Sequence, residues 1–189
     1  MSKDWNNHIV KSLQESISVK ERLIQDTSTI SQAADMLINC LKDGHTVFFA
    51  GNGGSAADAQ HLATELVGRF EKENELPAIA LTTDTSCLTA LANDFGYDSV
   101  FARQIKALLH SGDVLVAIST SGNSESINLA AQATHSKGGK VIAFTGRDGG
   151  KLKDLSDIAI VVPSKRTCRI QESHITIGHI LCELIEEAI

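Results

Sequence analysis

The sequence predicts a doubly wound α/β fold, in which helices cover both faces of a parallel β-sheet. Five short apolar runs are the expected strands: 46–50, 78–82, 113–118, 140–145 and 157–162. These runs do not alternate apolar with polar residues, which is typical of parallel strands that are buried on both faces. Helical segments are expected between and after them: about 55–70, 85–109, 123–137, 150–156 and from Arg169 to the end. Alternating strands and helices of this kind are typical of a doubly wound sheet.

An N-terminal helical extension is expected before the sheet, with two helices in residues 1–44. Apolar residues recur at helical spacing in both: Ile9, Val10, Leu13, Ile17 and Ile24, then Ile30, Ala33, Ala34, Leu37, Ile38 and Leu41. Thr27 or Ser28 is a candidate cap for the second helix, and Gly44 is its candidate end. Because the first helix precedes every strand, its apolar stripe needs a partner, which is either another subunit or the core of its own domain.

The length of 189 residues suits one domain over 1–189, with an α/β core at 45–189 and no linker or repeat. Only 4% of residues are aromatic and the formal net charge is −6, which disfavours nucleic-acid binding by stacking or by phosphate contacts. No apolar run approaches the roughly 18 residues of a membrane span, so no membrane association is expected. Four widely spaced cysteines and the absence of a signal-peptide pattern predict reduced thiols and a cytoplasmic location.

Two loops follow expected strands and have the composition of phosphate sites. Gly51–Ser55 (GNGGS) ends the first strand, and Ser119–Ser124 (STSGNS) ends the third. Ligands bind at the carboxyl ends of strands in open parallel sheets. Glycines let backbone N–H groups approach an anion, helix N-termini favour it, and hydroxyls can surround its oxygens. Ser55 is expected to cap the following helix; for the second loop, a serine-rich turn capped by Ser124 is the alternative.

A second interpretation exists for the glycine loop. Gly51, Gly53 and Ala56 match the dinucleotide fingerprint G-x-G-x-x-A, and Asp84 can then contact a ribose. However, Asp84 lies farther from the glycines than the usual ~20 residues. This interpretation also leaves the serine loop without a role.

Four polar side chains on two helices form a possible metal or acid–base site. His61 and Glu65 are four residues apart and share a helix face, and Gln171 and His179 are just over two turns apart on the last helix. Two imidazoles, a carboxylate and an amide oxygen can bind a divalent metal such as zinc. The alternative is a surface ion pair and a core histidine, and His174 need not point the same way.

Several motifs then resemble one family. The segments GNGGSAADAQHLATEL, ALTTDTS, ANDFGY, AISTSGNS, FTGRDGG and RIQESH…GH resemble the phosphoheptose isomerases of the sugar isomerase (SIS) superfamily, over nearly the whole chain. The resemblance implies a flavodoxin-like, five-stranded parallel sheet and a homotetramer with active sites at subunit contacts. It also implies conversion of D-sedoheptulose 7-phosphate to D-glycero-D-manno-heptose 7-phosphate, the first step toward ADP-heptose for the lipopolysaccharide inner core.

The same resemblance implies roles for individual residues. Glu65 is similar to the catalytic base of the family and His179 to its partner acid or base. The residues matching the zinc ligands, for one zinc per subunit, are His61, Glu65, Gln171 and His179. The residues matching substrate contacts are Asn52, Gly53, Gly54, Ser55, Glu65, Asn93, Asp94, Ser119, Thr120, Ser121, Ser124 and Gln171. Some relatives have an acidic residue where this chain has Cys168, so this chain offers no catalytic carboxylate at that position. For Asn93-Asp94 a simple turn is the alternative.

The implied reaction needs an acid–base pair. A carboxylate or imidazole removes the proton alpha to the carbonyl to give an enediol, and a second group moves protons between the oxygens. Two other functions stay open: a non-catalytic SIS regulator of the replication initiator, a branch that lacks equivalents of Glu65 and His179, and a sugar-phosphate-sensing module without an acid–base pair. A dinucleotide-dependent oxidoreductase is a more distant alternative.

Overall fold

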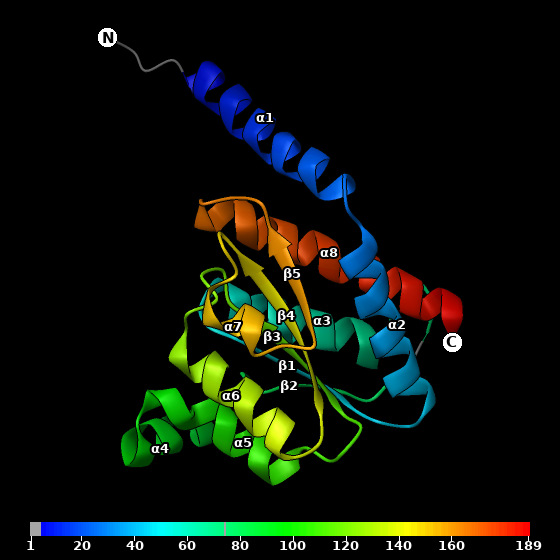
Figure 1. Ribbon diagram of the computed structural model, residues 1–189, viewed down its shortest axis with the longest axis vertical. Helices are drawn as coiled ribbons and strands as arrows, with labels where there is room; N and C mark the ends of the chain where they lie inside the picture. The colour runs from blue at the N-terminus through cyan, green and yellow to red at the C-terminus, as the bar shows by residue number, and fades with distance from the viewer. Residues whose placement is uncertain (1–4, 74) are drawn as a thin grey trace.

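A computed structural model describes residues 5–73 and 75–189 and shows one five-stranded sheet with all neighbours parallel (Figure 1). Its strands are β1 (Val47–Gly51), β2 (Ala78–Ala80), β3 (Val114–Ile118), β4 (Lys140–Gly146) and β5 (Ile158–Val162). The order β2-β1-β3-β4-β5 is that of the flavodoxin-like folds. The predicted fold class is therefore confirmed. Of the N-terminal segment predicted to be helical, residues 1–4 lie outside the described residues.

Helices cover both faces of the sheet. One layer contains α2 (Ser28–Lys42), α3 (Gly54–Val67) and α8 (Thr167–Ala188). The other contains α4 (Thr85–Phe95), the short 3-10 helix η1 (Tyr97–Ser99), α5 (Val100–Leu108), α6 (Glu125–Ser136) and α7 (Gly150–Asp154). Side chains of β1 alternate between the layers, because Val47 and Phe49 pack with the first and Phe48 and Ala50 with the second. Every residue of β1 is buried, which explains its continuous apolar sequence.

The prediction of one helix over 85–109 is wrong. The segment breaks at Gly96, whose φ of +82° ends α4 and begins the 3-10 turn before α5. The carboxylate of Asp84 accepts a hydrogen bond from the backbone N–H of Cys87 at 2.8 Å and caps α4. Thr27 occupies the N-cap position of α2 without a side-chain hydrogen bond to the helix.

The first helix, α1 (Trp5–Ile24), extends away from the sheet and lies beside α8 (Figure 1). Val19 is its one buried residue. The exposed apolar residues of α1 are Trp5, Ile9, Val10, Leu13, Ile17 and Ile24, each at least 49% exposed. Within the described chain, the domain's own core therefore does not cover this stripe.

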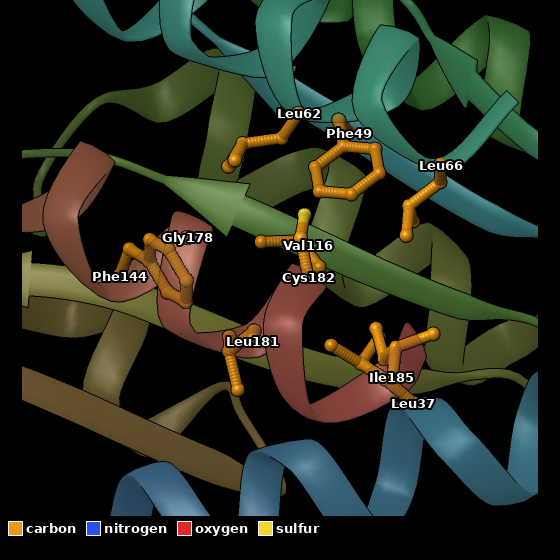
Figure 2. A pocket seen from close by; sticks show the side chains of 10 residues that line it. All are labelled: Leu37, Phe49, Leu62, Leu66, Val116, Phe144, Gly178, Leu181, Cys182 and Ile185. Atoms are coloured by element: carbon orange, nitrogen blue, oxygen red, sulfur yellow. The ribbon is translucent and has the colours of Figure 1, made fainter. Parts of the chain in front are cut away.

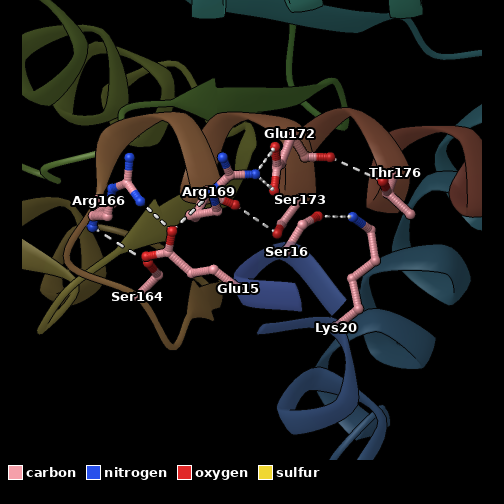
Figure 3. Close-up of polar contacts among 9 residues, drawn as sticks. All are labelled: Glu15, Ser16, Lys20, Ser164, Arg166, Arg169, Glu172, Ser173 and Thr176. Atoms are coloured by element: carbon pink, nitrogen blue, oxygen red, sulfur yellow. Dashed lines mark hydrogen bonds and ion pairs between the residues drawn. The ribbon is translucent and has the colours of Figure 1, made fainter. Parts of the chain in front are cut away.

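Polar contacts attach α1 to the first turns of α8 (Figure 3). The carboxylate of Glu15 pairs with the guanidinium groups of Arg166 and Arg169, the latter at 3.4 Å. Arg169 also donates two hydrogen bonds, of 2.7 and 2.8 Å, to Glu172. Burial opposes ionisation of Glu172, but hydrogen bonds from Ser16 and Arg169 outweigh it and lower the pKa of this carboxyl. Charged groups of α1 and α8 thus stabilise one another next to the segment that carries Gln171.

All four cysteines are free. Cys40 and Cys182 are buried, and burial raises the pKa of both thiols to about 12. Cys168 is exposed near the beginning of α8. Among the described residues, no helix combines the length and the apolar character that crossing a membrane requires.

Candidate active site

The two predicted phosphate loops follow the neighbouring strands β1 and β3, at the point in the sheet where the strand order changes direction. Strands β1 and β3 are neighbours, but the chain leaves β1 for α3 on one face and β3 for α6 on the other. Ligands of doubly wound folds bind in the crevice at such a point. Asn52 lies in it: its amide nitrogen donates to Ser126 Oγ at 3.0 Å, and its amide oxygen accepts from the Tyr97 hydroxyl at 2.7 Å.

The helix after the glycine loop begins two residues earlier than a cap at Ser55 would place it. α3 begins at Gly54 with Gly53 at the N-cap position, so the prediction that Ser55 caps the helix is wrong. Ser55 is buried, and its backbone N–H already donates to the carbonyl of Asn52 at 3.0 Å. A Cβ atom at Gly51 would lie 2.4 Å from the carbonyl oxygen of Ser55, so only glycine allows this tight turn. The result is a helix N-terminus, with its partial positive charge, at the crevice.

The serine loop presents hydroxyls at the same edge of the sheet. Ser119 is buried and donates through its hydroxyl to Ser124 Oγ at 3.1 Å. Ser124 occupies the N-cap position of α6, but its hydroxyl makes no capping hydrogen bond. The Ser121 hydroxyl accepts from the backbone N–H of Asn123 at 3.2 Å. Because the Ser124 hydroxyl makes no hydrogen bond to the backbone N–H groups of α6, hydroxyls of this loop can bind the oxygens of a phosphate group.

Three of the four residues predicted as metal ligands come together from α3 and α8. The Nε2 atoms of His61 and His179 are 2.8 Å apart, and Nε2 of His61 is 3.2 Å from Oε1 of Glu65. The two imidazole rings meet edge to face with centroids 5.1 Å apart. The His61 side chain is 47% exposed and that of Glu65 is 16% exposed, so solvent or a substrate can reach the pair from one side. His61 and Glu65 are therefore not an isolated surface pair.

The fourth residue, Gln171, binds a carboxylate that sequence reasoning missed. Its amide nitrogen donates to Oδ1 of Asp58 at 2.7 Å. Asp58 is 5% exposed, and its second oxygen has no hydrogen-bond partner. Burial raises the pKa of Asp58, while the bond from Gln171 and the nearby His61 and His179 partly oppose this. Since a carboxylate only accepts, the amide nitrogen of Gln171 must face Asp58, which leaves its carbonyl oxygen for another partner.

A glycine lets the two helices of the site approach closely. A Cβ atom at Gly178 would lie 2.5 Å from Cδ2 of Leu62, so α3 and α8 meet without a side chain between them at this level. Both residues also line a small apolar cavity of about 10 Å³ in the layer under the site (Figure 2). His179 follows Gly178 directly, and Leu62 follows His61. The close packing therefore sets the distance between the two imidazoles.

Other predicted residues lie apart from this cluster. Asn93 and Asp94 are exposed in the last turns of α4, where the amide of Asn93 donates to the carboxylate of Asp94 at 2.8 Å. His174 is fully buried with Nε2 2.9 Å from the carbonyl oxygen of Thr145, and burial lowers its pKa to about 4. His174 is thus a neutral core residue that points toward β4. In the described part of the chain, no three His, Cys, Asp or Glu side chains form a ready metal site.

Comparisons with known proteins agree with this architecture. The family model of the SIS domain matches residues 11–146. The phosphoheptose isomerase of Aquifex aeolicus is 52% identical over 183 residues, which cover 96% of each chain. The structure of phosphoheptose isomerase from Neisseria gonorrhoeae is 45% identical with a TM-score of 0.92, over 97% of this chain and 99% of that one. That from Francisella tularensis is 38% identical with a TM-score of 0.94, over 98% and 100%. The chain therefore belongs to the phosphoheptose isomerase family of SIS-domain proteins, and it is an isomerase.

Proposed function

We propose that the enzyme converts D-sedoheptulose 7-phosphate to D-glycero-D-manno-heptose 7-phosphate through an enediol, in the cytoplasm, as the first step toward ADP-heptose for lipopolysaccharide. The observation that carries this proposal is the contact of His61 with both Glu65 and His179, where α8 meets α3, the helix that begins at the glycine loop. An aldose–ketose isomerase needs an acid–base pair at one end of its substrate and an anion grip at the other. The names of the relatives support the choice of substrate.

In this mechanism Glu65 removes the proton alpha to the carbonyl, and His179 carries a proton between the two oxygens. Both side chains contact His61 Nε2, at 3.2 Å for Glu65 Oε1 and 2.8 Å for His179 Nε2, which supports this pairing. The limited exposure of Glu65 keeps bulk water from most of its carboxylate. General acid–base catalysis of this kind contributes about 10²- to 10⁴-fold to the rate.

The proposed phosphate grip uses the glycine and serine loops rather than lysine or arginine. Its residues are Asn52, Gly53, Gly54, Ser55, Ser119, Thr120, Ser121 and Ser124. The N-termini of α3 and α6 add partial positive charge to N–H and hydroxyl donors. A phosphate bound by these loops would orient C1 and C2 of the substrate toward Glu65. Asn93 and Asp94 are the proposed contacts to the sugar chain, because their segment is joined to Asn52 through Tyr97.

We further propose one zinc ion per subunit, held by His61, Glu65, Gln171 and His179. Imidazole nitrogens, a carboxylate oxygen and the free amide oxygen of Gln171 are suitable donors for it. The Nε2 atoms of His61 and His179 are 2.8 Å apart, and the described residues include no ready group of three His, Cys, Asp or Glu ligands, so the two rings would have to separate to hold the ion. When bound, the ion would polarise the substrate carbonyl and stabilise enediolate charge. The ligand and proton-transfer roles compete, because a lone pair bound to the ion cannot also accept a proton, so zinc would lower the basicity of Glu65 and occupy one imidazole nitrogen of His179.

The direct test is turnover with and without metal. Purified protein is incubated with sedoheptulose 7-phosphate, and formation of the aldoheptose phosphate is followed by chromatography. We expect turnover, its loss after dialysis against a chelator, and its return with zinc. Turnover that persists in protein shown to be metal-free would refute the zinc proposal alone. Binding without turnover in zinc-loaded protein would instead indicate a regulator or sensor.

A homotetramer is proposed from the exposed stripe of α1. Leu13 lies at the centre of this stripe and is 60% exposed. The substitution Leu13→Asp should disrupt assembly because it places a charge in an apolar interface. Ser18→Asp, on another side of α1, introduces the same charge and should leave assembly intact. Light scattering should give four times the chain mass of 20.2 kDa for the parent protein and Ser18→Asp, and less for Leu13→Asp. A monomeric parent protein contradicts the proposal.

A further inference from the structure

The last turn of α8 contains a buried carboxylate that binds another segment of the chain. Glu186 is 7% exposed, and its two oxygens accept hydrogen bonds of 3.1–3.3 Å from the backbone N–H groups of Phe70, Glu71 and Lys72. The Lys72 ammonium also donates to the backbone carbonyl of Glu186 at 3.2 Å. These donors belong to segment 69–73, which directly follows α3 and Gly68.

The position of this carboxylate is unfavourable for the helix itself. The C-terminus of a helix carries partial negative charge, so an acidic side chain in the last turn is destabilising there. Burial also opposes the charge of Glu186, but the three backbone N–H groups and Lys72 outweigh it and lower the pKa of this carboxyl. Three successive N–H groups around one anion form a backbone nest. The hydrogen bonds to Glu186 therefore hold segment 69–73 in a fixed position against α8.

Segment 69–73 touches the site through one side chain. The ring of Phe70 lies 5.5 Å, centroid to centroid, from the imidazole of His179, at an angle of 36°. Phe70 is half-buried and packs on the core between α3 and α8. Glu186 is seven residues after His179, two helical turns along the same side of α8. Phe70 therefore lies over His179 while its own backbone N–H is bound by Glu186.

We propose that Glu186 is a positioning residue for His179: it holds segment 69–73 so that the Phe70 ring fixes the orientation of the imidazole toward His61. The contact with Phe70 limits rotation of the imidazole about its side-chain bonds, because the two rings are in contact at a tilt of 36°. His61 approaches the same imidazole from α3 at 2.8 Å. The functional part of this inference rests on the proposed role of His179 in isomerisation.

The test combines kinetics with a direct observation of the ring. Glu186→Ala and Phe70→Leu should each lower kcat about tenfold with KM changed less than about twofold, because the phosphate loops are untouched. The double variant should be no slower than either single variant, since both act through one contact. Phe70→Tyr keeps the ring and should retain kcat. The matched control Glu187→Gln, an exposed neighbour in the last turn, should leave both constants unchanged.

Nuclear magnetic resonance of protein labelled in the imidazole nitrogens gives the independent observation. The ring signals of His179, assigned with His179→Gln, should move in Glu186→Ala and Phe70→Leu but not in Glu187→Gln. If Glu186→Ala does not fold, Glu186→Gln, which keeps one acceptor oxygen, takes its place. Unchanged ring signals, or additive losses of kcat, would overturn the inference. If the parent protein does not turn over sedoheptulose 7-phosphate, the proposed function fails, while the ring signals still decide the positioning role.

Discussion

Replacing Glu65 with Gln is expected to lower kcat for sedoheptulose 7-phosphate about a thousandfold, while the sugar phosphate still binds. The carboxamide has nearly the shape of the carboxylate, but it cannot accept the proton alpha to the carbonyl. The phosphate loops do not include Glu65, and they supply most of the interactions that bind and orient the substrate. The dissociation constant of the sugar phosphate should therefore change less than about threefold. The measurements are product formation and calorimetric titration with the substrate.

Two controls make the Glu65 result specific. Thr64→Ala, an exposed neighbour on α3 whose hydroxyl bonds only to the carbonyl of Gln60 among the contacts described, should retain kcat. The zinc content of Glu65→Gln must be measured, because loss of a ligand and loss of a base both lower the rate. Near-normal turnover in this variant would refute the assignment of Glu65 as the base.

Gly178→Ala is expected to separate the two helices of the site. The added methyl group would lie 2.5 Å from Leu62 Cδ2, and the neighbouring cavity of about 10 Å³ gives this side chain little room to move. Overpacking of this kind costs about 1–3 kcal/mol, against up to about 1 kcal/mol gained from the higher helix propensity of alanine. We therefore expect a net loss of unfolding free energy in urea and a drop in kcat of about tenfold or more, because His179 moves with α8.

A second substitution tests whether the contact with Leu62 is the cause. Leu62→Val shortens the side chain that the new methyl group meets, so Gly178→Ala with Leu62→Val should recover part of the lost kcat. Leu62→Val alone should cost about 1 kcal/mol of stability and leave kcat nearly unchanged. A Gly178→Ala variant that is more stable than the parent protein and fully active would show that the close approach of α3 and α8 does not constrain the site.

The strands and the two loops were predictable because their signals are local. Buried parallel strands have continuous apolar sequences, and the glycines and serines that follow β1 and β3 are turn residues wherever they occur. The break at Gly96 was not predicted, because an isolated glycine within a helical pattern is often tolerated. Its left-handed φ depends on how α4 and α5 pack, which the local pattern does not contain.

The candidate site was predictable only in part, since its contacts join distant segments. His61 and Glu65 share a helix face by spacing alone, and the family resemblance added Gln171 and His179. Asp58 precedes His61 by three residues and Glu65 by seven, so its place on that face was a usable signal. Its burial was not predictable, because it depends on a partner 113 residues away. Glu186 was missed for the same reason, with its partners 114 to 116 residues away.

The distance along the chain between His61 and His179 also has a consequence for biosynthesis. The two residues are 118 positions apart, and all five strands are made before α8. A nascent chain on the ribosome can thus complete its sheet before α8, which carries His179, is available to pack against α3. If His179 has its proposed catalytic role, activity is expected only after α8 has emerged and packed against α3, so the appearance of activity would report this docking step.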